Sequence, residues 1–168
     1  GLGDVYKRQM LWLMQKHPVV AVELSDIAAR EFFSDNELEF EVEQGDQLQH
    51  FIGPNIDFFC GDFFQLPKQL ISECTAVYDR AALVALPQDI RERYAARLTE
   101  TLVAGASMLL ITIEYDESLY EGPPFCIPQT EVERLYGLHF DIQELGANTE
   151  DFKGMQVSNR AYRLSRRP

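Results

Sequence analysis

The sequence predicts an α/β protein built on a largely parallel sheet. Four apolar stretches lack the alternation of a half-exposed strand, and each contains an acid near its carboxyl end or is directly followed by one. Unbroken apolar runs are typical of strands that are covered on both faces. Segments with helical spacing or helix-start signals separate the runs, which favours parallel strands joined by helices. The four stretches are Val19 to Leu24, Asn55 to Phe64, Ala76 to Tyr78 and Ser107 to Tyr115.

The N-terminal part is expected to run from helix to strand to helix. Met10 to Pro18 is apolar and then polar, which predicts the end of a helix stopped by proline. The first strand follows from Val19 to Leu24, and Ser25 and Asp26 are suited to cap the next helix.

The acidic segment 35–53 is weakly patterned, and only Glu39 to Glu43 alternates as a short edge strand does. After it, Asn55 to Phe64 predicts a strand that ends at Gly61-Asp62, and a short helix is expected from Lys68 to Ser72.

The stretch from Thr75 to Pro87 begins as a short strand and stops abruptly at the charged pair Asp79-Arg80. Pro87 suits the first turn of a helix, which the spacing of apolar residues predicts from Gln88 to Leu102. Ser107 to Tyr115 is the longest apolar run and is expected to be a central strand.

The C-terminal part is expected to end in two antiparallel strands. Gly122 to Phe125 cannot be helical, and Pro128 starts a helix that includes Glu131 to Tyr136. His139 to Leu145 and Val157 to Leu164 alternate like an antiparallel pair, with an acidic loop between them long enough to be mobile. Without a repeat or a linker, residues 10–168 are expected to form a single domain.

Charge and cysteine usage narrow the possible partners and the compartment. Fifteen Lys and Arg against 27 Asp and Glu give a net charge of −12, which disfavours nucleic acid and anionic membranes. Three scattered cysteines fit a reducing compartment, so a cytoplasmic protein is expected. No metal-binding motif and no membrane-spanning apolar run occurs in the sequence.

The first nine residues do not continue the pattern that begins at Met10. They show no apolar period and no strand, so residues 1–9 are expected to be a non-native or disordered leader. Gly1 and Gly3 form only G-x-G, which is too little for a phosphate-binding loop.

Two acids close strands that are expected to lie side by side, Glu23 and Asp62. In nucleotide-binding α/β folds such an acid commonly accepts hydrogen bonds from the ribose hydroxyls, and the next one can accept from adenine. Phe63 is placed to pack on the adenine ring. The pattern indicates an adenosine-type ligand, and a sulfonium-bearing adenosine suits this acidic chain better than a pyrophosphate dinucleotide.

The pair Asp79-Arg80 has two interpretations. It lines a ligand site at a strand end, or it is an ion pair that only ties a loop. A nicotinamide dehydrogenase is the least favoured enzyme class, since the G-x-G-x-x-G turn is absent from the sequence.

Five segments occur in this order along the chain: VAVELS, CGDFFQLP, VYDRAALVALP, ITIEYD and EGPPF. Together they resemble the thiopurine S-methyltransferase family, bacterial type. The resemblance covers nearly everything from Met10 to the C-terminus, and implies a class I S-adenosylmethionine-dependent methyltransferase with a Rossmann-like sheet whose last strand is antiparallel. Family members carry a first strand and a glycine-containing loop before Met10, so the resemblance also implies an N-terminally truncated copy.

The resemblance assigns roles to the residues already singled out. Glu23 is expected to bind the ribose of S-adenosyl-L-methionine, and Asp62 and Phe63 its adenine. Arg80 is expected beside both cofactor and substrate, in a positioning or charge role. The mouth of the acceptor pocket is assigned to Gly122, Pro123, Pro124 and Phe125.

The reaction implied is methyl transfer to the sulfur of a small aromatic or heterocyclic thiol such as a thiopurine, by a monomer. A related thiol, halide, selenium or tellurium methyltransferase stays open. So does a catalytically impaired fragment that at most binds an adenosine ligand.

Overall fold

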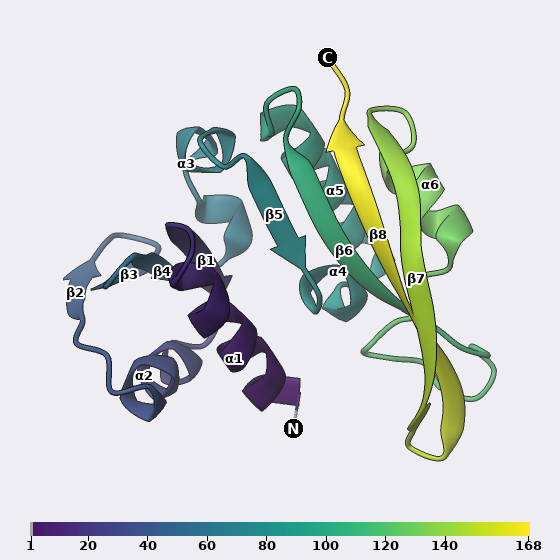
Figure 1. The fold of residues 1–168 in the computed structure, drawn as a ribbon, viewed down its shortest axis with the longest axis horizontal. Helices are drawn as coiled ribbons and strands as arrows, with labels where there is room; N and C mark the ends of the chain where they lie inside the picture. Colours follow the sequence, from purple (N-terminus) through teal and green to yellow (C-terminus); the bar gives the residue numbers. More distant parts are fainter. Residues whose placement is uncertain (1) are drawn as a thin grey trace. The chain divides into compact units, whose positions relative to one another are not determined.

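The computed structural model describes residues 2–168, with side chains from Arg8 onward. The chain divides into two compact units, unit 1 up to Leu66 and unit 2 from Pro67 to Pro168. Each unit contains its own four-stranded sheet (Figure 1). The expectation of a single domain over residues 10–168 stays a prediction. None of the helices in the described part of the chain is long and apolar enough to cross a membrane.

Unit 1 has the sheet order β1-β4-β3-β2. β1 and β4 are parallel, with Glu23 opposite Cys60, which confirms that the strands leading to Glu23 and Asp62 are neighbours. The elements are α1 (Leu2–Met14), β1 (Val19–Glu23), α2 (Asp26–Asp35), β2 (Glu41–Gln44), β3 (Gln49–Gly53), β4 (Ile56–Cys60) and the 3-10 turn η1 (Phe63–Gln65).

Helix α1 ends at Met14, before Pro18, where the sequence predicts a helix to stop. It begins at Leu2, so residues 2–9 have a helical backbone. That the first nine residues are foreign to the domain stays a prediction, and Gly1 lies outside the described residues.

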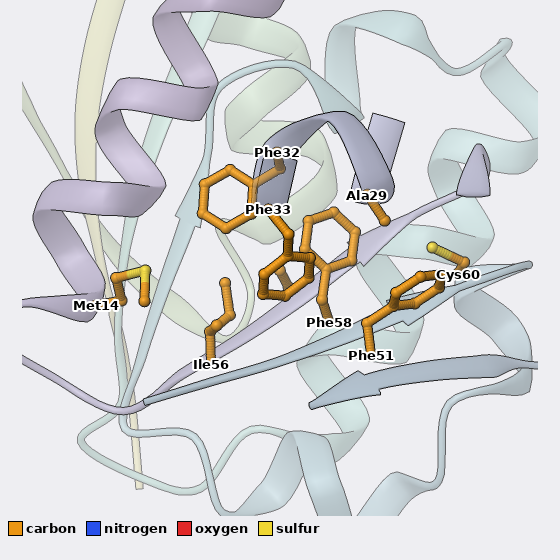
Figure 2. Packing of buried hydrophobic residues seen from close by; sticks show 9 residues of the cluster. Met14, Ala29, Phe32, Phe33, Phe51, Ile56, Phe58 and Cys60 are labelled. Atoms are coloured by element: carbon orange, nitrogen blue, oxygen red, sulfur yellow. The ribbon is translucent and has the colours of Figure 1, made fainter. Parts of the chain in front are cut away.

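The core of unit 1 is aromatic and lies between α2 and the sheet (Figure 2). Phe33 of α2 stacks on Phe51 of β3 with ring centroids 6.3 Å apart, and Phe32 lies 6.0 Å from Phe58 of β4. All four rings are at most 1% exposed, and burial of each stabilises the fold by roughly 1.5–3 kcal/mol. This core fixes α2 on the strands that carry the candidate site.

Unit 2 has the sheet order β5-β6-β8-β7, with β5 parallel to β6 and β8 antiparallel to both β6 and β7. The antiparallel last strand and the predicted helix before it are thus confirmed. The elements are α3 (Lys68–Ser72), β5 (Ala76–Asp79), α4 (Ala82–Ala85), α5 (Gln88–Thr101), β6 (Ser107–Glu114), α6 (Gln129–Tyr136), β7 (Phe140–Phe152) and β8 (Met155–Arg166).

The expectation of a mobile loop between the last two strands is wrong. β7 and β8 stay paired as far as Phe152 and Met155, and a two-residue turn joins them. Lys153 and Gly154 have φ values of +53° and +81°, as a type I′ hairpin turn requires. The acidic segment is ordered because its backbone groups pair across the hairpin, a gain that its side-chain pattern does not reveal.

Candidate functional site

On unit 1, Glu23 ends β1 with its carboxylate turned to the following backbone. Oε1 accepts hydrogen bonds from the N–H groups of Leu24 at 2.8 Å and Ser25 at 3.3 Å. Within the described residues no hydrogen bond reaches the second oxygen, Oε2. The half-buried carboxylate is therefore oriented by the backbone and keeps one oxygen for a ligand.

Asp62 lies just beyond the neighbouring strand β4, at the same edge of the sheet. Its Oδ1 accepts the N–H of Phe64 at 2.9 Å and so caps the 3-10 turn η1. Phe63, the first residue of that turn, is half-buried and meets Phe64 edge to face at 5.6 Å. The turn thus begins with an acid followed directly by an aromatic residue.

Gly61 joins the ends of β1 and β4. Its N–H donates to the Glu23 carbonyl at 2.9 Å. Its φ is +142°, and a Cβ there would lie 2.9 Å from the Gln47 carbonyl oxygen. Only glycine suits this position, which sets the spacing between the two acids.

On unit 2, the structure separates the charged pair Asp79-Arg80. Asp79 is 3% exposed, and its Oδ1 accepts from the N–H groups of Ala82 and Leu83 at the start of α4. Its Oδ2 accepts from the Tyr94 hydroxyl at 2.9 Å. Burial raises the pKa of Asp79, against the lowering effect of these hydrogen bonds. Asp79 therefore has a structural role, because it supports the start of α4 and binds α5.

Arg80 is half-buried, unlike the buried Asp79. It lies beside the Tyr78 hydroxyl, where burial raises the pKa of Tyr78 and the Arg80 charge and hydrogen bond partly offset that rise. Of the pair, Arg80 is the member that remains accessible to a ligand.

The segment Gly122–Phe125 lies next to the segment that follows Arg80. The N–H of Phe125 donates to the Val84 carbonyl in α4 at 2.6 Å. Gly122 has a φ of +92°, and the Gly122-Pro123 and Pro123-Pro124 peptide bonds are both cis. Unit 2 thus brings together two segments that are 42 residues apart at Arg80 and Gly122 in the sequence.

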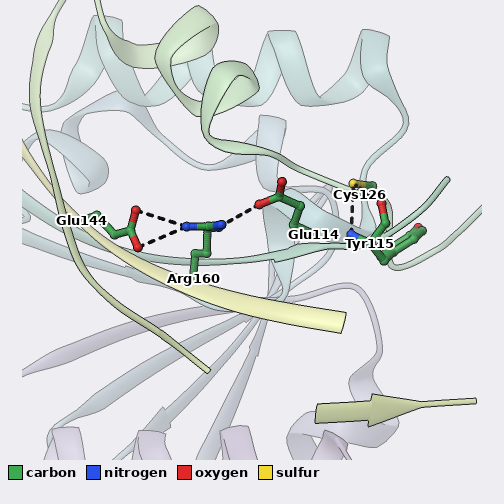
Figure 3. Close-up of polar contacts among 5 residues, drawn as sticks. All are labelled: Glu114, Tyr115, Cys126, Glu144 and Arg160. Atoms are coloured by element: carbon green, nitrogen blue, oxygen red, sulfur yellow. Dashed lines mark hydrogen bonds and ion pairs between the residues drawn. The ribbon is translucent and has the colours of Figure 1, made fainter. Parts of the chain in front are cut away.

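The carboxyl end of β6 anchors the same segment (Figure 3). The Tyr115 hydroxyl donates to the Pro124 carbonyl at 2.7 Å, and the Cys126 Sγ lies 3.4 Å from the Tyr115 nitrogen and 3.3 Å from its carbonyl oxygen. These contacts of Tyr115 and Cys126 were not predicted from the sequence. The only signal was the proximity of aromatic residues to the double proline.

Glu114, the acid that ends β6, is part of an ion-pair network (Figure 3). Arg160 of β8 donates to Glu114 through Nε at 2.7 Å and to Glu144 of β7 through Nη1 at 3.2 Å. Three strands are thus tied at the level where the loop after β6 begins. This acid is paired with arginine, whereas no ion pair of Glu23 or Asp62 occurs among the side chains described from Arg8 onward.

Unit 1 also has a shallow, open depression, which lies away from Glu23 and Asp62. It is lined by residues 38–41 and 52–54, at the end of β3 that pairs with the beginning of β4. The acids Glu23 and Asp62 lie at the opposite, carboxyl end of β1 and β4. Strand-end chemistry is the stronger guide to a ligand site in an α/β sheet.

Solved structures resemble this chain in fold. A methyltransferase from Methanosarcina mazei matches with a TM-score of 0.66 at 11% identity, over 95% of this chain and 86% of that one. One from Anabaena variabilis matches with a TM-score of 0.63 at 16% identity, over 95% and 72%. Both are described as dependent on S-adenosylmethionine. The fold is therefore that of the class I S-adenosylmethionine-dependent methyltransferases.

The family model for thiopurine S-methyltransferase matches residues 6–166. The chain belongs to the thiopurine S-methyltransferase family. Proteins of that name are 43% identical over 135 residues in Bordetella pertussis and 40% identical over 159 residues in Teredinibacter turnerae. These matches cover 80% and 92% of this chain, and 62% and 74% of the respective relatives. The chain thus spans a little under two thirds of the Bordetella protein.

Proposed function

We propose that this chain carries cofactor-binding and acceptor-binding residues of an S-adenosylmethionine-dependent thiol methyltransferase. The observation that carries the proposal is the placement of Glu23 and Asp62 at the carboxyl ends of two paired parallel strands. Family membership and the methyltransferase fold support it.

The residues on unit 1 fit the adenosine part of S-adenosyl-L-methionine. Glu23 has an oriented carboxylate with one oxygen available, which suits the vicinal hydroxyls of ribose. Asp62 is exposed, and Phe63 beside it offers an apolar ring for adenine. Both acids also favour the positive charge of a sulfonium.

When bound, S-adenosyl-L-methionine supplies a methyl group activated by the sulfonium charge. The task of the chain is then to orient the partners and exclude water. Arg80 is proposed to touch cofactor and acceptor and to stabilise the anionic form of a thiol. It cannot serve as a base, because a guanidinium stays protonated in proteins.

The acceptor is proposed to be a small aromatic or heterocyclic thiol such as a thiopurine. The residues assigned to the mouth of its pocket are Gly122, Pro123, Pro124 and Phe125, which hydrogen bonds tie to α4 and to Tyr115. The names of the relatives support this acceptor class. A monomeric, cytoplasmic protein without nucleic-acid or membrane partners is part of the same proposal. The net charge of −12 disfavours nucleic acid and anionic membranes as partners.

Titration calorimetry with S-adenosylhomocysteine tests the cofactor site. The chain is expected to bind, and Glu23→Gln is expected to weaken binding about 10- to 100-fold, the effect of losing charge-assisted hydrogen bonds. Glu41→Gln, an exposed acid on β2, is the matched control and is expected to bind normally. Equal affinity for Glu23→Gln and the unmodified chain would contradict the assignment.

A panel of acceptors with one methyl donor tests the reaction. Turnover of thiols supports the proposed activity, whereas turnover of halide, selenium or tellurium species favours the related enzymes. Binding of the product S-adenosylhomocysteine without turnover of any acceptor favours an adenosine-binding module.

A further inference from the structure

The hairpin β7–β8 extends past the end of β6. β6 pairs with β8 only as far as Glu114 opposite Ser158, whereas β7 and β8 continue to pair to Phe152 opposite Met155. Val157 in this extension is 1% exposed, so the base of the extension is packed within the protein. Figure 1 shows the hairpin passing the carboxyl end of β6, where residues 115–126 begin. We call residues 115–126 the acceptor loop.

The tip of the hairpin contacts the acceptor loop through Tyr120. The Lys153 ammonium lies 3.0 Å from the Tyr120 hydroxyl and 4.5 Å from the centre of its ring. The Phe152 ring meets the Tyr120 ring edge to face at 5.8 Å. One loop side chain is therefore held by a cation and by a second aromatic ring.

Tyr120 in turn connects to the segment that lines the proposed acceptor pocket. Its hydroxyl donates to the Pro123 carbonyl, and its ring meets Tyr115 at 5.9 Å. Tyr115 donates to the Pro124 carbonyl. A continuous series of contacts thus runs from Lys153 to the two prolines.

The backbone at Lys153 is unusual for lysine. Its φ of +53° is the left-handed conformation that asparagine and glycine adopt most readily in a type I′ turn. Lysine at this position is unfavourable for the turn, and what it adds is the ammonium that reaches Tyr120.

We propose that Lys153, at the tip of the β7–β8 hairpin, is a positioning residue that holds the acceptor loop through Tyr120 and thereby shapes the site for the thiol. The proposal rests on the proposed function only for the identity of the acceptor. The contact between hairpin and loop is a property of unit 2 and can be tested without turnover.

Cys126 reports the state of the loop, since its thiol is half-buried against Tyr115. Cys74 follows α3 and is half-buried, and its thiol donates a hydrogen bond to the Leu70 carbonyl. It serves as an internal reference in the same unit. Burial raises the pKa of both thiols. The charges that shift the pKa of Cys126 come from Glu117, Glu114 and Arg91, which a substitution of Lys153 leaves in place.

The experiment measures alkylation rates of Cys126 and Cys74 by iodoacetamide, resolved by peptide mass spectrometry. In the variant Lys153→Asn, asparagine suits the turn better than lysine does, and the ammonium is removed. The variant is expected to raise the alkylation rate of Cys126 about two- to fivefold. Loss of one exposed cation–π contact increases the population of the open loop by about this factor. Lys153→Arg is expected to stay near the unmodified rate, and the Cys74 rate is expected to stay constant.

Lys68→Met is the matched control, because Lys68 is an exposed lysine of unit 2 paired with Glu100 at 3.4 Å. It is expected to leave both rates unchanged. An unchanged Cys126 rate in Lys153→Asn would overturn the proposal.

In the methyl-transfer assay, Lys153→Asn is expected to raise the KM for the thiol by a similar factor, with kcat and the Kd for S-adenosylhomocysteine unchanged. Faster Cys126 alkylation with an unchanged KM would overturn the link to the acceptor. Absence of turnover in the unmodified protein would count against the proposed function, whereas the alkylation rates would still decide whether Lys153 holds the loop.

Discussion

The hydroxyl of Tyr94 donates a 2.9 Å hydrogen bond to Asp79, and both side chains are almost completely buried. The pair joins the carboxyl end of β5 to α5 in the interior of unit 2. Asp79 also binds the first N–H groups of α4. The residue directly before Arg80 is thus held from two helices, which fixes where the chain presents Arg80.

We predict that Tyr94→Phe lowers the free energy of unfolding by about 1–3 kcal/mol, since it leaves a buried carboxylate without one of its donors. Tyr162→Phe is the matched control. Tyr162 is also buried, but its hydroxyl has no hydrogen-bond partner among the described residues. Loss of the Tyr162 hydroxyl is expected to leave the free energy of unfolding unchanged or to raise it. Denaturant unfolding of both variants measures the difference, and equal losses would contradict the role given to the Tyr94 hydroxyl.

Asp79 is expected to make stability depend on pH. Burial raises its pKa in the folded protein above the ordinary value of 3.8. The folded state therefore binds the proton more tightly than the unfolded state, and the stability from the neutral form is complete below pH 3.8 and is lost as the pH rises through the raised pKa.

The variant Asp79→Asn stays neutral at every pH and keeps an oxygen that can accept from Ala82 and Leu83. We predict that the unmodified protein loses stability relative to this variant as the pH rises above 3.8. Unfolding curves at a series of pH values measure the difference. A difference that does not change with pH would show that the Asp79 pKa is not raised in the folded state.

Gly122→Ala is expected to destabilise the fold and to disturb the acceptor loop. Its φ is +92°, and a Cβ there would lie 2.6 Å from Phe125 Cδ1. The backbone conformation alone costs about 1–3 kcal/mol for a residue with a side chain.

Gly105→Ala separates the two causes, because Gly105 has a φ of +83° and nothing within 4 Å of its Cβ position. Gly122→Ala is expected to lose more unfolding free energy than Gly105→Ala, by the cost of displacing the Phe125 ring. Equal losses would show that the ring moves aside freely.

Arg80→Ala is expected to lower kcat/KM for methyl transfer about 10- to 100-fold, which corresponds to the loss of charged hydrogen bonds. Arg80→Lys is expected to recover only part, since lysine lacks the planar fork. Arg80→Ala is expected to stay folded, with a small shift of the unfolding midpoint from the lost contact with Tyr78. Arg163→Ala, at an exposed position on β8, is the control for removal of a positive charge. Near-normal turnover in Arg80→Ala would remove Arg80 from the site.

Strong local patterns predicted most of the fold. The unbroken apolar runs identified β1, β4, β5 and β6, and the helix Lys68–Ser72 was predicted with its observed bounds. β3 was not predicted, because Gln49–Gly53 has a single fully buried residue, Phe51, among half-buried neighbours. It is a strand because its backbone pairs with β2 and β4 on both sides.

For the site, the sequence by itself predicted that Glu23 and Asp62 come at the ends of strands covered on both faces, since each follows an unbroken apolar run. The pairing of β1 with β4 bears out that these strands are neighbours. Only the tertiary structure decided the fate of the other charged residues. Asp79 is buried because Tyr94 and α4 satisfy its oxygens, and Glu114 is paired because β8 brings Arg160 to it. Likewise, Lys153 reaches Tyr120 only because β7 and β8 stay paired past β6. Such partners lie 15 to 46 residues apart, beyond the range of any local pattern, and are brought together only when the sheet forms.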